Sequence, residues 1–246
     1  MTAPVFVVEH LDAGQGGRYV LEGPEGRHAV SVKRLRPGED VVLTDGAGRW
    51  ADCVVLETEG KDRLILRVDS VAEEPEPRPR ITVVQALPKG DRGELAVETM
   101  TEVGVDGIVP WSASRCITQW KGERGLKALG KWRATAREAG KQSRRVRFPE
   151  VADAATSKQI AALLAKADFA AVLHESGTQP LAAAELPTEG EIVLVVGPEG
   201  GVSPEELALF EEAGARAYVL GPTVLRTSTA GTAAAALLLG RTGRWG

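Results

Sequence analysis

Hydrophobic residues in the first seventy positions occur in short runs that alternate with polar residues. This pattern predicts β-strands, because successive side chains of a strand point to opposite faces of its sheet. Asp45-Gly46-Ala47-Gly48 lies between two of these runs and contains the glycines that a hairpin turn needs for positive φ. We therefore expect a small N-terminal β-barrel. Its expected strands cover residues 5–8, 18–21, 40–44, 50–57 and 64–68.

A short helix is expected to interrupt the barrel near residues 26–35, in a basic segment that contains His28, Lys33, Arg34 and Arg36. After the last strand, Pro75, Pro77 and Pro79 alternate with charged residues. Proline has no backbone N–H and a fixed φ, so this segment suits neither a helix nor a central strand. The predicted organisation is a barrel over residues 1–72, a stiff linker over 73–80 and a second domain over 81–246.

Beyond the linker, short apolar runs alternate with longer segments of helical periodicity. Continuous apolar strands separated by helices indicate an α/β domain whose mainly parallel sheet is covered on both faces. The expected strands cover residues 81–86, 107–110, 169–173, 192–196 and 217–220. The expected helices cover residues 93–103, closed by Gly104, then 127–143, 157–167 and 231–239.

The composition, 43% hydrophobic and 26% charged over 246 residues, is ordinary for a globular protein. Its longest apolar stretches, such as residues 233–239, fall well short of the roughly 20 residues that a membrane-spanning helix needs. The first ten residues lack the basic start and sustained apolar core of a secretory signal. We therefore expect a cytoplasmic protein.

Cys53 and Cys116 lie far apart in the sequence, and neither has a neighbouring pair of histidines. This spacing offers neither a disulfide framework nor a set of metal ligands. We expect buried or idle thiols and no bound metal.

Positive charge is concentrated in one segment although the whole chain carries a net charge of −4. Residues 115–147 contain eleven Lys or Arg and two Glu, a net +9, which leaves −13 for the rest of the chain. A solvated helix face is the common meaning of a charge run, but this excess favours a surface that binds phosphates. Charge alone does not specify a sequence or a type of RNA.

The most distinctive motif follows the expected strand at residues 192–196 and reads Gly197-Pro198-Glu199-Gly200-Gly201. Ser203 is then placed as the N-cap of a helix, with Pro204 at the first helical position and Glu206 three residues after the cap. A turn held in this way lies at the carboxyl end of a sheet strand, where open α/β sheets bind ligands. The alternative is a tight connection that binds nothing.

A second strand, loop and helix follow at once, with Gly221-Pro222-Thr223-Val224-Leu225-Arg226 as the loop. Two such loops in succession would form a shared rim around one ligand site at the carboxyl end of the sheet. The chain has no G-x-x-x-x-G-K-[ST] loop and no G-x-G-x-x-G after its first α/β strand, which disfavours a nucleoside triphosphate. S-adenosylmethionine has no phosphate and is compatible with backbone groups and an apolar slot.

Five short sequence motifs, taken together and in order, resemble those of the RsmE family, the uracil-N3 methyltransferases of 16S ribosomal RNA. Two of them contain the loops, residues 197–201 and 220–227, and a third is Glu138-Ala139-Gly140-Lys141-Gln142-Ser143-Arg144-Arg145. The others are residues 89–92 with 101–105, and His28 with Arg34. The resemblance implies a PUA-like barrel joined to a SPOUT domain with a trefoil knot, which is a rare topology. It also implies a homodimer with S-adenosylmethionine bound at its interface.

The resemblance assigns site residues position by position. It places cofactor contacts at Leu173, His174, Gly197, Pro198, Glu199, Gly200, Gly201, Leu220, Gly221, Leu225, Arg226, Thr229 and Ala230. It places RNA contacts at His28, Arg34, Lys89, Arg92, Arg115, Gln142, Ser143 and Arg145. Thr99 and Ser228 depart from the family, whose members commonly have Lys and Glu at these positions, so neither carries an essential charge.

Methylation at N3 of uridine requires loss of a proton and stabilisation of negative charge on the neighbouring carbonyl oxygens. Guanidinium groups offer paired donors to such an anion, which makes Arg145 and Arg226 the candidate catalytic residues. Glu199 could instead act as a general base. The alternative is that Glu199 accepts hydrogen bonds from its own loop or pairs with an arginine.

Two other functions share most of these features. One is methylation of a different RNA, such as transfer RNA, and the other is a non-enzymatic RNA-binding factor for ribosome assembly. The first differs from a 16S methyltransferase only in the surface that reads RNA, and the second in having no cofactor-dependent turnover. Much of the prediction of the substrate therefore rests on likeness of fold.

Overall fold

The computed structural model describes residues 3–246 and divides into two compact units. The first unit contains the residues up to Glu76 together with Gly140–Phe148. The second contains Pro77–Ala139 and Pro149–Gly246. The sequence predicted a single crossing at the proline-rich linker, so the return of Gly140–Phe148 to the first unit is a difference from that expectation.

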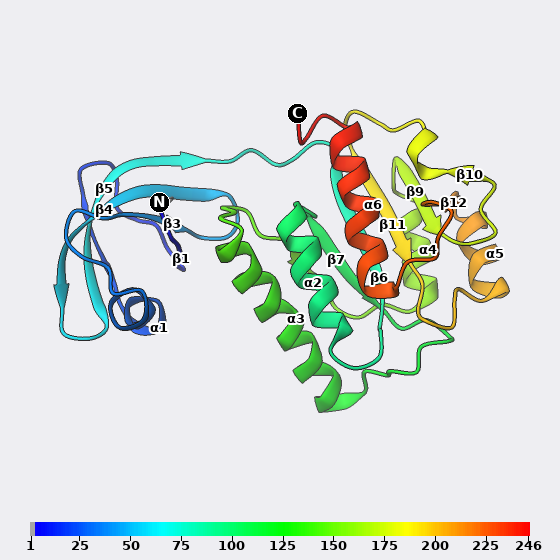
Figure 1. The fold of residues 1–246 in the computed structure, drawn as a ribbon, viewed down its shortest axis with the longest axis horizontal. Coiled ribbons are helices and arrows are strands. Elements are labelled where there is room, and N and C mark those ends of the chain that lie inside the picture. Colours follow the sequence, from blue (N-terminus) through cyan, green and yellow to red (C-terminus); the bar gives the residue numbers. More distant parts are fainter. Residues whose placement is uncertain (1–2) are drawn as a thin grey trace. The chain divides into compact units, whose positions relative to one another are not determined.

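The first unit is built on a curled five-stranded sheet with the strand order β1-β3-β4-β5-β2. Its strands are β1 (Val5–Val7), β2 (Arg18–Leu21), β3 (Asp40–Thr44), β4 (Arg49–Glu59) and β5 (Arg63–Glu73). The long strands β4 and β5 bend (Figure 1), and their pairing has two register shifts. Gly46 and Gly48 have positive φ in the turn between β3 and β4, as the sequence predicted.

The expected helix of the first unit is present as α1 (Gly23–Arg27) followed by a π-helical turn, η1 (His28–Val32). It starts earlier than expected because Pro24 occupies the first turn, where its missing N–H costs nothing. Arg34, at φ 57°, follows its end.

Gly140–Phe148 is fastened to the first unit by polar contacts. Lys141 Nζ lies 2.9 Å from Glu25 Oε1, and both side chains are largely buried. The Thr44 hydroxyl donates to the Val146 carbonyl at 2.7 Å, and Arg147 Nη2 donates to the Glu74 carbonyl at 2.7 Å. Two cations of the basic segment therefore hold the first unit together.

The second unit contains a seven-stranded sheet with the order β10-β12-β9-β11-β6-β7-β8, in which every neighbouring pair is parallel. Its strands are β6 (Arg80–Ala86), β7 (Gly107–Trp111), β8 (Glu150–Val151), β9 (Phe169–Leu173), β10 (Gln179–Pro180), β11 (Glu191–Val196) and β12 (Arg216–Val219). The parallel sheet that the sequence predicted is confirmed.

Helices pack against this sheet and bury its central strands. They are α2 (Arg92–Val103), α3 (Gly122–Gln142), α4 (Ser157–Leu164), η2 (Leu181–Ala183), α5 (Pro204–Glu212) and α6 (Thr227–Arg241). Figure 1 shows α2 and α6 side by side, with α6 in front of β6 and β11. Gly231 of α6 allows this approach, since a Cβ there would lie 2.9 Å from Met100 Sδ. None of the helices within residues 3–246 is long and apolar enough to cross a membrane.

Both cysteines are buried, in line with the expectation of inert thiols. Burial, together with the carboxylates of Asp69 and Asp52, raises the pKa of Cys53 to about 12. Burial also raises the pKa of Cys116. Neither thiol is therefore disposed to act as a thiolate.

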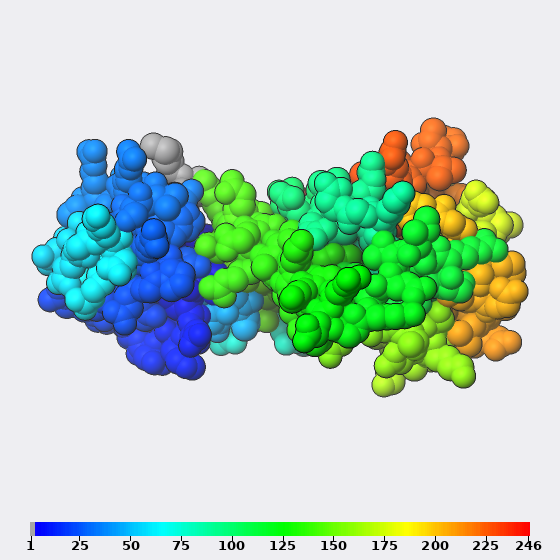
Figure 2. All heavy atoms as spheres, turned by 90° about the horizontal axis from the view of Figure 1, so that it is seen from below, coloured from blue at the N-terminus to red at the C-terminus, as the bar shows by residue number. Residues whose placement is uncertain are grey.

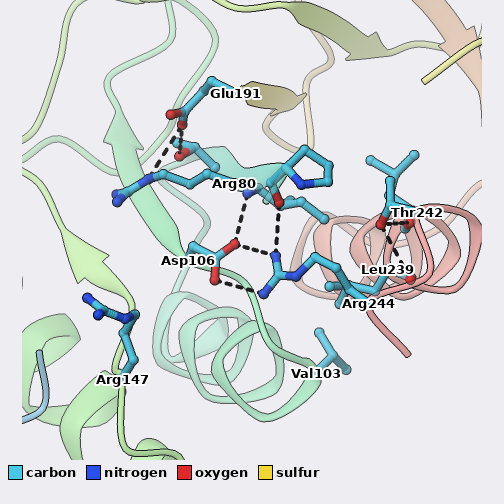
Figure 3. A network of polar contacts seen from close by, with 12 residues as sticks. Arg80, Val103, Asp106, Arg147, Glu191, Leu239, Thr242 and Arg244 are labelled. Atoms are coloured by element: carbon cyan, nitrogen blue, oxygen red, sulfur yellow. Dashed lines mark hydrogen bonds and ion pairs between the residues drawn. The ribbon is translucent and has the colours of Figure 1, made fainter. Parts of the chain in front are cut away.

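The amino end of the sheet is closed by a buried ion pair (Figure 3). Arg244 follows α6 and makes two hydrogen bonds to Asp106, at 2.5 and 3.1 Å, with the Asp106 side chain only 4% exposed. Asp106 also accepts from the backbone N–H of Ile81 at 2.9 Å. The end of the chain is thus tied to the start of β6.

The carboxyl end of the sheet contains a buried carboxylate that joins three elements. Glu206 of α5 accepts from the N–H and hydroxyl of Ser114, at 2.7 and 2.9 Å, and from the hydroxyl of Ser157 at 2.8 Å. It also completes the expected capping box with Ser203. Burial alone would raise the pKa of Glu206, but these hydrogen bonds outweigh burial and lower it.

Replacing Arg244 by Ala should lower the free energy of unfolding by roughly 3 kcal/mol, because Asp106 would remain buried without its bidentate partner. Urea denaturation measures this change. Arg133→Ala is the matched control, since Arg133 pairs with Asp153 on the surface and exposed pairs contribute about 1 kcal/mol or less. Equal losses of unfolding free energy in the two variants would contradict a stabilising role for the buried ion pair of Arg244 with Asp106.

Glu206→Gln should lower the free energy of unfolding at neutral pH by about 2 kcal/mol, because an amide has only one oxygen for these donors. The folded-state pKa lies below the ordinary 4.5, so the stabilisation is present above about pH 4.5 and is lost as the pH falls through the folded-state value. Denaturation from pH 7 to pH 3 should show the two proteins converging. Glu211→Gln, on the exposed side of α5, is the control, and a difference independent of pH would disprove the charge effect.

Candidate functional site

Two loops at the carboxyl edge of the parallel sheet enclose a cavity of about 610 Å³. The first loop, residues 197–201, follows β11, and the second loop, residues 220–226, follows β12. β9 lies between these two strands and contributes Leu173 and His174. The shared rim that the sequence predicted is therefore present.

All but one of the expected cofactor residues line this cavity. The lining includes Leu173, His174, Gly197, Pro198, Glu199, Gly200, Gly201, Leu220, Gly221, Leu225, Arg226 and Ala230. The exception is Thr229, whose N–H and hydroxyl donate to the Arg226 carbonyl at 2.9 and 3.1 Å. Thr229 thus fixes the start of α6 rather than contributing to the wall.

Several further residues line the cavity that were not among the expected cofactor contacts. They are Glu175, Val196, Val202, Tyr218, Val219, Pro222, Thr223, Val224 and Thr227. Val196, Tyr218 and Val219 belong to the two predicted strands, and their position just before the loops is a signal that could have identified them. Glu175 carried no signal of its own in the sequence.

The glycines of the first loop are required by close approach. A Cβ on Gly197 would lie 2.9 Å from Val202 Cγ2, and one on Gly200 would lie 3.2 Å from Arg115 Cβ. Gly201 has φ +74°, which favours glycine. Arg115 Nη1 also donates to the Gly200 carbonyl at 3.1 Å, so a neighbouring loop braces this turn. The turn is a wall of a cavity as well as a tight connection.

Glu199 makes a contact that neither sequence hypothesis described. Its Oε1 accepts from the backbone N–H of Lys89 at 3.1 Å, in the loop that follows β6. The carboxylate therefore joins two loops of the same sheet edge. This contact is closer to the hypothesis that Glu199 accepts hydrogen bonds from backbone N–H groups than to the hypothesis that it acts as a general base. The donor N–H, however, belongs to another loop.

His174 is held in one tautomer by its own turn. Its Nδ1 accepts from the backbone N–H of Ser176 at 3.1 Å and lies 2.7 Å from the Ser176 hydroxyl. Because a backbone N–H can only donate, Nδ1 is unprotonated and the proton of the neutral ring is on Nε2. His174 can therefore offer one hydrogen-bond donor at the cavity.

Two residues expected to contact RNA line the same cavity, namely Arg92 and Arg115. Arg92 Nη1 donates to the Ser228 hydroxyl at 3.4 Å. At the other departure from the family pattern, the Thr99 hydroxyl lies 2.7 Å from that of Thr232. Ser228 therefore contacts a guanidinium and Thr99 contacts another hydroxyl, and both contacts join α2 to α6.

Five other residues expected to contact RNA belong to the first unit. They are His28, Arg34, Gln142, Ser143 and Arg145. His28 packs edge-on against Phe6, and Arg145 Nε donates to the Arg147 carbonyl at 2.8 Å. Of the two candidate catalytic arginines, Arg226 lines the cavity and Arg145 does not.

The basic face of α3 lies on the surface of the second unit, where Figure 2 shows the green part of the chain as a continuous outer layer. Its exposed cations are Arg124, Lys127, Lys131, Arg133 and Arg137. Trp132 is only 2% exposed and meets Trp120 edge-on at 4.9 Å. Trp132 therefore serves core packing.

Comparison with known proteins places both units in characterised families. A model described as an RNA methyltransferase domain matches residues 74–239, and one described as an RNA methyltransferase PUA domain matches residues 21–69. Ribosomal RNA small subunit methyltransferase E of Mycobacterium bovis is 46% identical over 250 residues, which cover 100% of this chain and 94% of that protein. The Bacillus subtilis protein of the same name is 28% identical over 86% of each chain.

A solved structure agrees with these matches along nearly the whole chain. Ribosomal RNA small subunit methyltransferase E from Neisseria gonorrhoeae, bound to S-adenosyl methionine, has a TM-score of 0.85 at 30% identity and covers 98% of both chains. Two family models, a relative of nearly equal length and a shared fold all agree. The chain therefore belongs to the family of ribosomal RNA small subunit methyltransferase E.

Proposed function

We propose that this protein transfers a methyl group from S-adenosylmethionine to N3 of a uridine in 16S ribosomal RNA. The observation that carries the proposal is the cavity between the first and second loops, in a chain 46% identical to a ribosomal RNA small subunit methyltransferase. The protein would act in the cytoplasm, on RNA of the small ribosomal subunit, as a homodimer. Light scattering would then give twice the 26.0 kDa mass of one chain.

The wall of the cavity fits a cofactor without phosphate groups. Backbone groups of two glycine-containing loops and apolar side chains such as Leu173 and Val196 make up much of the lining. Of the three arginines in the lining, Arg115 donates to the Gly200 carbonyl and Arg92 to the Ser228 hydroxyl. Glu175 and Glu199 add carboxylates that suit a cationic ligand. Bound S-adenosylmethionine would supply a methyl group carried on a positively charged sulfur.

The acceptor nitrogen sets a second requirement. N3 of uridine becomes nucleophilic only when its proton is lost, which leaves negative charge on the two adjacent carbonyl oxygens. Arg226 lines the cavity, its backbone carbonyl accepts from the N–H groups of Thr229 and Ala230, and its guanidinium is the first proposed donor to such an oxygen. Arg145, in the first unit, is the second proposed donor.

Mass spectrometry of ribosomal RNA from cells with and without the gene tests the proposal. We expect one uridine of 16S RNA to lose a single N3 methyl group in the cells that lack the gene, and to regain it when the purified protein and S-adenosylmethionine are added. A methyl group lost from transfer RNA instead, or no change in any RNA, would reject the proposal in favour of the other two functions.

Arg226→Ala should lower kcat for methyl transfer by about a hundredfold or more, because one donor to the developing anion is removed. Arg226→Lys should recover only part of this rate, since an ammonium cannot offer paired planar donors. Single-turnover assays at saturating cofactor measure the chemical step. Arg216→Ala removes an exposed arginine at the amino end of β12 and is the control. Wild-type turnover in Arg226→Ala would remove this residue from the mechanism.

The exposed face of α3 is proposed to bind RNA phosphates. Replacing Lys127 and Lys131 together by Ala should weaken RNA binding and reduce the dependence of log affinity on log salt by about one for each lost contact. Filter binding at several salt concentrations measures this slope. Lys158 and Lys166, two exposed lysines of the same unit outside α3, form the matched control pair. An equal change of slope in both double variants would argue for diffuse electrostatics rather than a defined surface.

A further inference from the structure

Gln85 is a polar side chain in the interior of the second unit. It lies at the carboxyl end of β6, is 0% exposed and pairs in register with Val196, the last residue of β11. The neighbouring positions Val83, Val84 and Ala86 are apolar and fully buried. A buried amide weakens a fold unless its hydrogen bonds are made, so this position needs a reason beyond packing.

The amide of Gln85 begins a directed chain of hydrogen bonds. Its Nε2 donates to the Ala86 carbonyl at 3.1 Å and to the Thr227 hydroxyl at 3.2 Å. The Thr227 hydroxyl in turn donates to the Gly197 carbonyl at 2.6 Å. Because a hydroxyl has one proton, the donation from Gln85 leaves that proton for Gly197.

This relay, defined as Gln85, Thr227 and Gly197, joins the two loops of the cavity. Gly197 is the first residue of the first loop, and Thr227 directly follows Arg226, the last residue of the second loop. Gly197 and Thr227 line the cavity, whereas Gln85 does not. The bond from Thr227 to Gly197 spans thirty positions of the chain, so no local turn enforces it.

We propose that Gln85 and Thr227 are positioning residues. They hold the first and second loops at the separation needed to bind one cofactor molecule between them, and they fix the position of Arg226 at the end of the second loop. This inference rests on the proposed function for the identity of the cofactor. It concerns the loops themselves, however, and can be examined in protein without any ligand.

A simple packing role makes a different prediction. Valine has nearly the shape of threonine, so packing alone would tolerate Thr227→Val and leave the loops unchanged. The relay would not tolerate it, because the Gly197 carbonyl and the Gln85 amide would both lose a partner in the interior. Thr227→Ser loses a methyl group but keeps the hydroxyl, so the two hypotheses predict opposite orders for these variants.

Hydrogen–deuterium exchange of the ligand-free protein is the first test. In Thr227→Val we expect faster exchange in the peptides that contain residues 196–202 and 220–230, with the central strands as protected as in the wild type. Thr227→Ser should resemble the wild type. Unchanged exchange of residues 196–202 in Thr227→Val would overturn the relay whatever the cofactor is.

Calorimetric titration with S-adenosylmethionine is the second test. Thr227→Val should raise Kd about tenfold or more, while Thr227→Ser should change it by less than about threefold. Gln85→Met keeps similar volume without polar atoms and should raise Kd, and its effect should not add to that of Thr227→Val, because both break one chain of bonds. Additive effects, or a larger loss in Thr227→Ser than in Thr227→Val, would overturn the relay.

The two proposals fail in different ways in this design. If the folded wild-type protein did not bind S-adenosylmethionine, the proposed function would fall, and with it the cofactor-gripping part of the inference. If the wild type bound it and Thr227→Val bound it equally well, only the relay would fall. Thermal denaturation of each variant separates a local effect on the loops from a loss of the fold.

Discussion

The parallel pairing of β6, β9, β11 and β12 is the constraint on which the site depends. Parallel strands end at one edge of their sheet, so the loops that follow them must meet there. Since β9 lies between β11 and β12, the first and second loops face each other across its end and can enclose one cavity. β6 and β11 are buried along almost their whole length and pair in continuous register from Arg80 with Glu191 to Gln85 with Val196.

Polar contacts at both edges of the sheet hold this arrangement. Helix α6 starts at Thr227 beside the cavity, and Arg244, just beyond its other end, is bound to Asp106 at the amino edge. Glu206 and Glu199 each connect neighbouring loops at the carboxyl edge through backbone and hydroxyl donors. The basic segment is divided between two places: Lys141 and Arg147 make contacts within the first unit, whereas Lys127 and Lys131 lie exposed on α3.

Much of the fold could be predicted because periodicity and turn residues are local properties. The strands at residues 18–21, 40–44 and 169–173 were predicted with their observed bounds, and so was the capping box of Ser203 and Glu206. The return of Gly140–Phe148 to the first unit could not be predicted, since Lys141 and Glu25 are 116 positions apart. The same holds for the bond of Thr227 to Gly197, and β8 and β10 are too short to leave a pattern. The trefoil knot remains a prediction.

A crystal structure of the protein soaked with S-adenosylmethionine tests the central claim most directly, because it shows where the ligand lies. The account predicts density for one cofactor molecule per chain, in contact with both the first loop and the second loop and close to Arg226. A cofactor bound at any other place, or contacts with only one of the two loops, would contradict it.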